Sequence, residues 1–245
     1  MNITRPSLIN DTWPIILTPD RYEFHAARPE WESKRLESCA KLIQPRMTVY
    51  DLGAESGDFT ALYRSWVGPT GNVVAVEPSP PYWPSIRQTW EGNNFGPPPS
   101  WFSGFVSDIT DLAPEQDEMA YSRVDDGTGW PVSSNGEVIP DFGFRHLCQQ
   151  AASTPQITID DLADRVGAPD AIVMDIEGSE YRALQGASRV LTEDRPLVWV
   201  SVHPLPLDEW YGRCPADIHV LMRDYGYRGD FLGVCTEELW LYTPR

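Results

Sequence analysis

The feature that most constrains the fold is a glycine-containing turn between an apolar strand and a helix, followed by a second strand that ends in an acid. Residues 49–60 read VYDLGAESGDFT, and residues 73–78 read VVAVEP. Glycines in such a turn let backbone N–H groups approach a ligand closely, at the positive end of a helix. The acid that closes the second strand, Glu77, suits a ribose because a ribose offers two hydroxyl groups. The pattern predicts a nucleoside-containing cofactor across the carboxyl ends of parallel strands.

The glycine spacing distinguishes between cofactors. The dinucleotide fingerprint G-x-G-x-x-G brings the backbone against a pyrophosphate, whereas Gly53 and Gly57 here form a D-x-G-x-x-x-G pattern that begins at Asp51. The carboxylates of Glu55 and Asp58 would repel a pyrophosphate but suit a sulfonium with an amino-acid tail. The turn resembles motif I of the class I S-adenosylmethionine (SAM) methyltransferases, and the missing third glycine argues against a nicotinamide dehydrogenase. A glycine turn after any buried strand is the structural alternative.

A second motif lies far along the chain. Residues 169–180 read PDAIVMDIEGSE, and residues 184–187 read LQGA. This segment resembles the D-x-E-G-x-E…L-x-G-A stretch of the FkbM family of methyltransferases. Residues 157–162 (ITIDDL) resemble that family's lead-in, and residues 196–204 (PLVWVSVHP) resemble its next strand. The resemblance extends from about residue 42 to residue 204, which is most of the chain.

Two positions depart from the family pattern. Glu55 stands where the family usually has Asn within the glycine turn, and Ser201 stands where it commonly has Glu, two residues before His203. The first departure affects how the methionine tail would be held. The second affects the ligands of any metal.

Strands and helices alternate along most of the 245 residues, which predicts one domain with right-handed crossovers. Together with the resemblance, this predicts an α/β fold of the doubly wound, Rossmann-like class I methyltransferase type, with a mostly parallel sheet and an antiparallel C-terminal strand. The expected helices cover residues 29–43, 57–66, 86–92, 159–166, 181–191 and 217–225. The expected strands cover residues 48–51, 73–77, 101–106, 171–175, 197–202, 227–231 and 238–242, the last two as an antiparallel pair.

Two segments fall outside this alternation. Residues 1–28 are expected to be irregular and to wrap the domain edge or cover the cofactor. Residues 109–155 are expected to form an inserted flap over the acceptor site, with a hairpin of residues 119–124 and 137–139 around its turn signals. A disordered surface excursion is the alternative for this second segment.

A ligand of a doubly wound sheet binds outside the carboxyl ends of its strands. Gly53 and Gly57 are assigned to close backbone approach and Glu77 to the ribose hydroxyls. Ser107 and Asp108 are assigned to the adenine, although Asp108 could equally be a helix cap or turn residue. The residues expected to bind SAM are Asp51, Gly53, Ala54, Glu55, Gly57, Phe59, Thr60, Glu77, Pro78, Ser107, Asp108 and Asp175.

Three residues are the catalytic candidates: Asp175, Glu177 and His203. Methyl transfer to a hydroxyl requires loss of the hydroxyl proton, and His203 could accept that proton as a general base, oriented by Asp175 and Glu177. Alternatively, a hard cation such as Mg²⁺ bound by Asp175 and His203 could lower the pKa of the hydroxyl. Against both, acids at this place can simply cap a helix, and we expect this for Glu180, facing away from the site.

Other aromatic and histidine residues are ambiguous. Trp83, Trp101 and Trp130 could contact a sugar acceptor, although tryptophans are more often core residues. His25 could reach the site from the N-terminal segment, but a solvated surface position is expected. His146 and His219 carry no usable pattern.

Composition excludes several classes of binding partner. A net charge of −17, from 36 acids and 19 basic residues, opposes binding to nucleic acid. No apolar stretch reaches the roughly 20 residues that span a bilayer, and the N-terminus does not resemble a signal peptide. The four cysteines are scattered without a C-x-x-C pair, so zinc and disulfides are not expected. We expect a cytoplasmic protein without membrane or nucleic-acid partners, whose oligomeric state the sequence does not indicate.

The favoured interpretation is a SAM-dependent O-methyltransferase of the FkbM type, acting on a hydroxyl of a sugar, glycan or natural product. A SAM-binding scaffold without turnover is the second hypothesis. A nucleic-acid methyltransferase is a third, because residues 79–82 read SPPY, as in DNA amino-methyltransferases. That motif follows the fourth strand in those enzymes but the second strand here, which argues against the third hypothesis.

Overall fold

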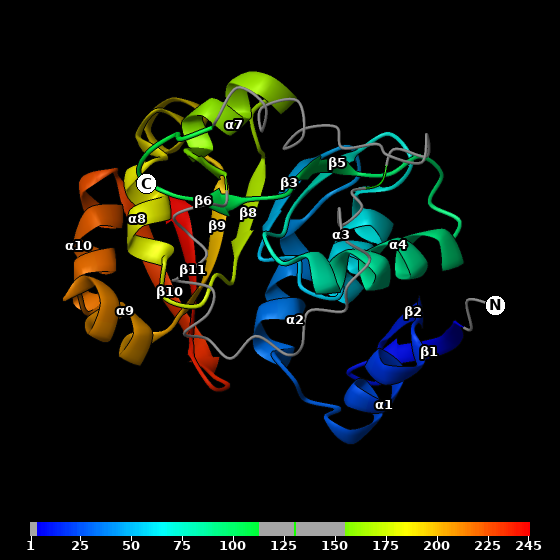
Figure 1. The fold of residues 1–245 in the computed structure, drawn as a ribbon. Coiled ribbons are helices and arrows are strands. Elements are labelled where there is room, and N and C mark those ends of the chain that lie inside the picture. Colours follow the sequence, from blue (N-terminus) through cyan, green and yellow to red (C-terminus); the bar gives the residue numbers. More distant parts are fainter. Residues whose placement is uncertain (1–3, 113–129, 131–154) are drawn as a thin grey trace.

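The structure, a computed structural model, describes residues 4–112, 130 and 155–245. At its centre is a seven-stranded sheet in the order β10-β11-β9-β8-β3-β4-β5 (Figure 1). β11 is antiparallel to β9 and β10, and the pairings among the remaining strands are parallel. The strands are β3 (Thr48–Leu52), β4 (Asn72–Val76), β5 (Ser100–Phe102), β8 (Ala171–Met174), β9 (Leu197–Val202), β10 (Tyr227–Val234) and β11 (Glu238–Pro244). The predicted α/β fold, mostly parallel with an antiparallel C-terminal strand, is confirmed.

The central strands are apolar on both faces because helices cover both sides of the sheet. Tyr50 and Leu52 of β3 face one core, and Val49 faces the other. The first core includes residues of α7 (Ile159–Val166), α8 (Glu180–Gln185), the π-helix η2 (Val190–Asp194), α9 (Pro204–Tyr211) and α10 (Pro215–Asp224). The second includes residues of α2 (Ser33–Leu42), α3 (Asp58–Val67) and α4 (Trp83–Gly92), which follows the short 3₁₀ helix η1 (Pro80–Tyr82).

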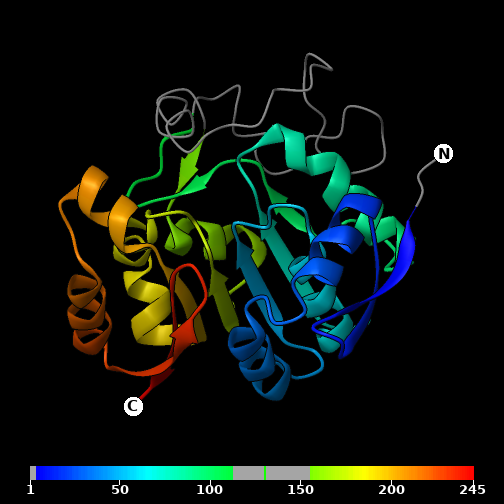
Figure 2. The same cartoon turned by 90° about the horizontal axis from the view of Figure 1, so that it is seen from below.

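The N-terminal segment is regular, contrary to the expectation for residues 1–28. β1 (Arg5–Ile9) and β2 (Trp13–Leu17) form an antiparallel hairpin, and α1 (Pro19–Ala27) follows it. The hairpin buries Ile9, Ile15 and Leu17 in the second core. Figure 2 shows the hairpin and α1 on the same side of the molecule as α3 and α4. Local apolar alternation therefore outweighed the prolines of this segment.

Two further predicted elements are wrong in their extent. The strand expected at residues 101–106 is broken: β5 belongs to the main sheet, whereas β6 (Phe105–Val106) pairs with β7 (Gln156–Ile157). The break lies at Gly104, where a Cβ atom would come 2.4 Å from the carbonyl of Pro155. The helix expected at residues 181–191 is interrupted at Gly186, whose missing side chain admits the backbone of Ser107.

Most of the predicted flap and its hairpin lie outside the described residues, so they stay predictions. Within the described part of the chain, no helix is both long and apolar enough to span a bilayer.

Candidate active site

The glycine turn after β3 packs tightly against the ends of β4 and β8. Gly53 has a φ of +91°, and a Cβ atom there would lie 1.9 Å from the backbone oxygen of Asp175. The N–H groups of Gly53 and Ala54 donate to the last carbonyl of β4, at 2.9 and 3.0 Å. Gly57 has a φ of +79°, and a Cβ atom there would come 2.8 Å from the Cα of Ile86. Close backbone packing therefore requires both glycines.

Glu77 lies directly after β4 and is fixed by the backbone around it. Its Oε2 accepts from the N–H of Glu55 at 2.8 Å, and its Oε1 accepts from the N–H of Ser79 at 2.7 Å. Burial raises the pKa of this carboxyl to about 7 despite these hydrogen bonds. Each oxygen keeps a further lone pair that could accept a hydrogen bond from a hydroxyl group.

Asp51 supports the turn from the strand side. Its Oδ2 accepts from the hydroxyl of Thr60, on the first turn of α3, at 2.5 Å. Burial raises the pKa of Asp51 to about 7. The hydrogen bond ties the end of β3 to the start of α3, on either side of the glycine turn.

A cavity of about 550 Å³ opens at this edge of the sheet. It is lined by ten of the predicted site residues: Asp51, Gly53, Ala54, Glu55, Phe59, Glu77, Pro78, Asp175, Glu177 and His203. Gly57, Thr60, Ser107 and Asp108 do not line it. Asp108 instead accepts from the Nε of Arg182 at 2.7 Å, and this pairing holds its pKa below the usual range against the effect of burial.

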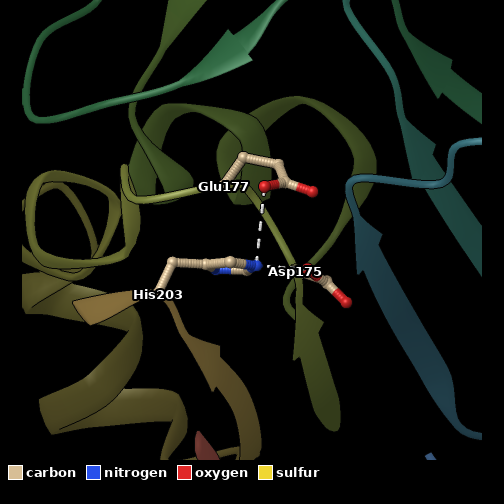
Figure 3. A group of neighbouring side chains, drawn as sticks. All are labelled: Asp175, Glu177 and His203. Atoms are coloured by element: carbon tan, nitrogen blue, oxygen red, sulfur yellow. Dashed lines mark ion pairs between the residues drawn. The ribbon is translucent and has the colours of Figure 1, made fainter. Parts of the chain in front are cut away.

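The three catalytic candidates come together at the ends of β8 and β9 (Figure 3). The Nε2 of His203 lies 3.5 Å from Asp175 Oδ1 and 3.6 Å from Glu177 Oε2. Glu177 has a left-handed backbone, with a φ of 56°. The next residue, Gly178, leaves room for Pro206, whose Cβ would lie 2.5 Å from a Cβ at this position. Non-glycine residues in this conformation tend to occur at functional sites.

Glu180 belongs to this group, contrary to the expectation that it faces away. Its side chain is completely buried, and its Oε1 lies 2.8 Å from the Nδ1 of His203 and accepts from the N–H of Gly178 at 2.9 Å. Burial disfavours the charged imidazole, but this hydrogen bond and the charges of the surrounding carboxylates outweigh burial and raise the pKa of His203 to about 10. The orienting group of His203 is therefore Glu180, at the third acid of the D-x-E-G-x-E motif.

A buried ion-pair network, which the sequence did not indicate, lies behind Asp175. Arg35 of α2 contacts the carboxylate of Glu32 and donates to Asp175 Oδ2 at 3.2 Å and to the hydroxyl of Ser201 at 2.7 Å. Glu237, from the turn between β10 and β11, is also buried in the cavity wall. A signal existed in the sequence: Arg35 shares the apolar face of its helix with Leu36 and Cys39, both fully buried.

A second network joins α1 to the glycine turn. Arg21 donates to Asp58 Oδ2 from Nε at 3.0 Å and from Nη2 at 2.7 Å, and the Nε2 of His25 lies 2.6 Å from the same oxygen. Burial favours the neutral form of Asp58, but the two partners outweigh it and hold its pKa far below the usual range. The expected surface position of His25 is wrong, because only 1% of this residue is exposed.

The tryptophans considered for the acceptor site belong to the core. Trp83, Trp101 and Trp130 are buried and pack edge to face against one another. The aromatic residues that do line the cavity are Phe24, Trp31, Phe59, Tyr82 and Phe105.

The model of a family described as the methyltransferase FkbM domain matches residues 51–228, well over half of the chain. This chain belongs to the FkbM methyltransferase family. Both the predicted family and the class I fold are confirmed. No curated protein matches the chain by sequence.

A solved structure of the same family shows the same fold. A crystal structure of an FkbM methyltransferase from Methylobacillus flagellatus KT has a TM-score of 0.52 and 19% identity, over 80% of this chain and 43% of that chain. The present FkbM chain thus spans less than half the length of that methyltransferase. Two others have lower TM-scores: a fibrillarin pre-rRNA processing protein from Methanococcus jannaschii (0.49, 11% identity, 98% and 82% coverage) and a precorrin-6y C5,15-methyltransferase from Geobacter metallireducens GS-15 (0.48, 12% identity, 86% of both chains).

The cavity of this FkbM methyltransferase fits SAM. Gly53 and Ala54 of the turn line it, and Glu77 presents a fixed carboxylate for a ribose diol. The volume of about 550 Å³ lies within the ordinary range for cofactor sites. The acids along the walls suit a sulfonium, which carries a positive charge.

Proposed function

We propose that this FkbM methyltransferase transfers a methyl group to a hydroxyl of a sugar, glycan or natural-product acceptor. His203 acts as the general base. The observation that carries this proposal is the position of His203: its Nδ1 is engaged by Glu180 at 2.8 Å, while its Nε2 lies beside Asp175 and Glu177 on the cavity wall.

SAM supplies an electrophilic methyl group on a positively charged sulfur. The chain's residues must hold the acceptor hydroxyl in line with that group and take its proton. Glu180 fixes the proton on the Nδ1 of His203, so that Nε2 is the atom that can accept a proton from the cavity side. Asp175 and Glu177 can accept hydrogen bonds from neighbouring hydroxyls and orient the acceptor.

The protonation state of His203 sets the expected pH dependence. A pKa of about 10 means that the imidazole holds both protons at neutral pH, so the fraction of free base increases as the pH rises toward that value. A positive charge bound in the cavity lowers this pKa, because it disfavours a second cation nearby. We therefore expect turnover to increase with pH above neutrality.

The cavity walls favour a neutral, polyhydroxylated acceptor. Glu32, Glu177 and Glu237 offer carboxylate oxygens to hydroxyl groups, and Trp31 and Tyr82 offer aromatic faces. The net charge of −17 opposes polyanionic acceptors, so we propose a small-molecule or glycan acceptor and not nucleic acid. We also propose that the protein acts in the cytoplasm, without a membrane partner.

A divalent cation is the alternative means of activating the hydroxyl. Ligand atoms of Asp175, Glu177 and His203 lie within 4.8 Å of one another, as do those of Glu32, Asp175 and Glu237. Carboxylate ligands suit Mg²⁺. In this scheme removal of the metal would abolish turnover.

Mass spectrometry of a panel of sugars and hydroxylated natural products, incubated with deuteromethyl-labelled SAM, tests the proposal. A gain of one labelled methyl group on oxygen is the expected result, and parallel incubations with EDTA distinguish the base from the metal. SAM binding by calorimetry without S-adenosylhomocysteine release on any acceptor would support the scaffold hypothesis instead.

His203→Ala should abolish turnover while it changes SAM affinity little, because the imidazole contacts the acceptor side of the cavity. Calorimetry with SAM and S-adenosylhomocysteine release measure the two effects separately. A variant that retained turnover would exclude His203 as the base, and one that lost SAM binding would make it a structural residue.

A further inference from the structure

Three cationic side chains line the cavity among the described residues: Arg21, Arg35 and His203. In two of them the outer nitrogens are already engaged. Arg35 binds Glu32, Asp175 and Ser201, and His203 lies among three carboxylates. Arg21 differs because its guanidinium has one nitrogen with only a long contact.

Arg21 is held on one edge and open on the other. Its Nε and Nη2 both donate to Asp58 Oδ2, at 3.0 and 2.7 Å, whereas its Nη1 lies 3.5 Å from the half-exposed carboxylate of Glu55. His25, one helical turn further along α1, contacts the same Asp58 oxygen from a buried position. The guanidinium also stacks on Phe24, with its Cζ 4.2 Å from the ring centroid. These contacts fix the orientation of Arg21 at the cavity wall.

We propose that Arg21 binds the carboxylate of the amino-acid tail of SAM through Nη1, in an orientation fixed by Asp58, His25 and Phe24. This inference rests on the cavity being the SAM site. The tail of SAM is a zwitterion, so it needs a cation for its carboxylate and acids for its ammonium group. Arg21 and Glu55 supply one of each at the glycine turn.

The N-terminus of α3 favours the same arrangement. This ten-residue helix begins at Asp58, and its positive end points to the turn. Asp58 already neutralises part of that charge, and Arg21 restores a positive charge there. A tail carboxylate beside Arg21 would therefore meet both the guanidinium and the helix end.

The proposed contact lies outside the part of the chain that the FkbM model matches, which begins at residue 51. The N-terminal helix α1 would accordingly form a wall of the cofactor site from outside the matched part of the chain. Glu55 stands where the resemblance would lead one to expect Asn, and it is the residue that Nη1 of Arg21 faces. Arg21 and Glu55 therefore form one charged pair at the glycine turn.

The test compares SAM with decarboxylated SAM, which keeps the sulfonium and the ammonium group and lacks only the carboxylate. Calorimetry on the full chain measures both dissociation constants in the wild type, Arg21→Met, Arg21→Lys and the control Arg28→Met. Arg28 stacks on the same Phe24 ring but is exposed and does not line the cavity. We expect the wild type and Arg28→Met to prefer SAM by about 10-fold or more, the usual effect of a charge-assisted hydrogen bond.

In Arg21→Met the preference should fall to within about 2-fold, through weaker SAM binding with little change for decarboxylated SAM. Arg21→Lys keeps the charge and should show an intermediate preference, which serves as the test should Arg21→Met fold poorly. An unchanged preference in the Arg21 variants, or an equal loss for both ligands, would overturn the proposal. A wild type that binds neither ligand would instead refute the cofactor site itself.

Discussion

At Gly53 the backbone leaves no room for a side chain. Two constraints exclude a side chain here. The φ of +91° is left-handed, and a Cβ atom would lie 1.9 Å from the backbone oxygen of Asp175. Relief of that contact requires β3 and β8 to separate at their carboxyl ends, where the cavity begins. A single methyl group would therefore disturb both stability and the shape of the cofactor site.

Gly53→Ala is expected to lower the free energy of unfolding by about 3 kcal/mol or more, because backbone strain adds to the clash. Urea unfolding measures this change. Gly212→Ala is the matched control, since Gly212 also has positive φ (+58°), in the left-handed helical region, but nothing lies within 4 Å of its Cβ position; it should cost only about 1 kcal/mol. Equal losses at the two sites would show that packing against Asp175 is unimportant.

Glu180→Gln removes a carboxylate from the Nδ1 side of His203, so the pKa of His203 should fall from about 10. Because that carboxylate raises the pKa, its loss should move the rise of turnover with pH toward lower pH. NMR titration of the His203 ring, assigned with His203→Gln, follows the pKa without an acceptor. A pKa that stayed the same would mean that Glu180 does not interact with the imidazole in solution.

At the scale of elements, Arg35 links three parts of the chain. It connects α2 to the end of β8 through Asp175 and to β9 through Ser201. All polar partners of Arg35 are buried or partly buried, so water cannot easily replace them as partners of its guanidinium. The position of β8 relative to β9, and with it the geometry of the catalytic candidates, depends on this side chain.

Arg35→Met is expected to destabilise the protein by about 3–5 kcal/mol, because it leaves the buried Glu32 without its cation. Thermal or urea unfolding measures the loss. Lys34→Met removes one partner of the exposed Lys34–Glu37 pair and should change stability by less than about 1 kcal/mol. A small effect at Arg35 would imply that Glu32 is protonated, as burial favours by raising its pKa.

The elements differ in how far the sequence determines them. The central strands and α2, α3, α7 and α10 follow from apolar periodicity and glycine punctuation, and the structure has them near the predicted bounds. The hairpin β1–β2 was missed, although Asn10 and Asp11 both have positive φ, and such residues between alternating apolar positions are typical of a hairpin turn.

The site residues that were missed depend on distant contacts. Arg35 is 140 residues from Asp175 and 166 from Ser201, so the pattern of its helix indicates that Arg35 is buried but not which residues it contacts. Glu180 was misjudged because helix capping and orientation of His203 predict the same acid at the same place. The role of Asp108 as a partner of Arg182 likewise depends on a contact 74 residues away.

At the scale of the whole molecule, the charge of −17 predicts a salt effect on stability. Added salt screens repulsion among the acids, so the midpoint of thermal unfolding should rise between about 20 and about 300 mM NaCl. The effect should shrink near pH 5, where carboxylates begin to protonate. A midpoint that falls with salt would indicate that ion pairs such as those of Arg21 and Arg35 outweigh the repulsion.

The place of β11 in the sheet determines when the sheet can be completed during synthesis. β11 (Glu238–Pro244) lies between β9 and β10, so β9, which ends directly before His203, has an unpaired edge until residues 238–244 have been translated. A nascent chain halted before residue 238 would expose β9 as a template for pairing with other chains. The sheet can therefore close only after β11 has been made, and until then β9 needs protection from other chains.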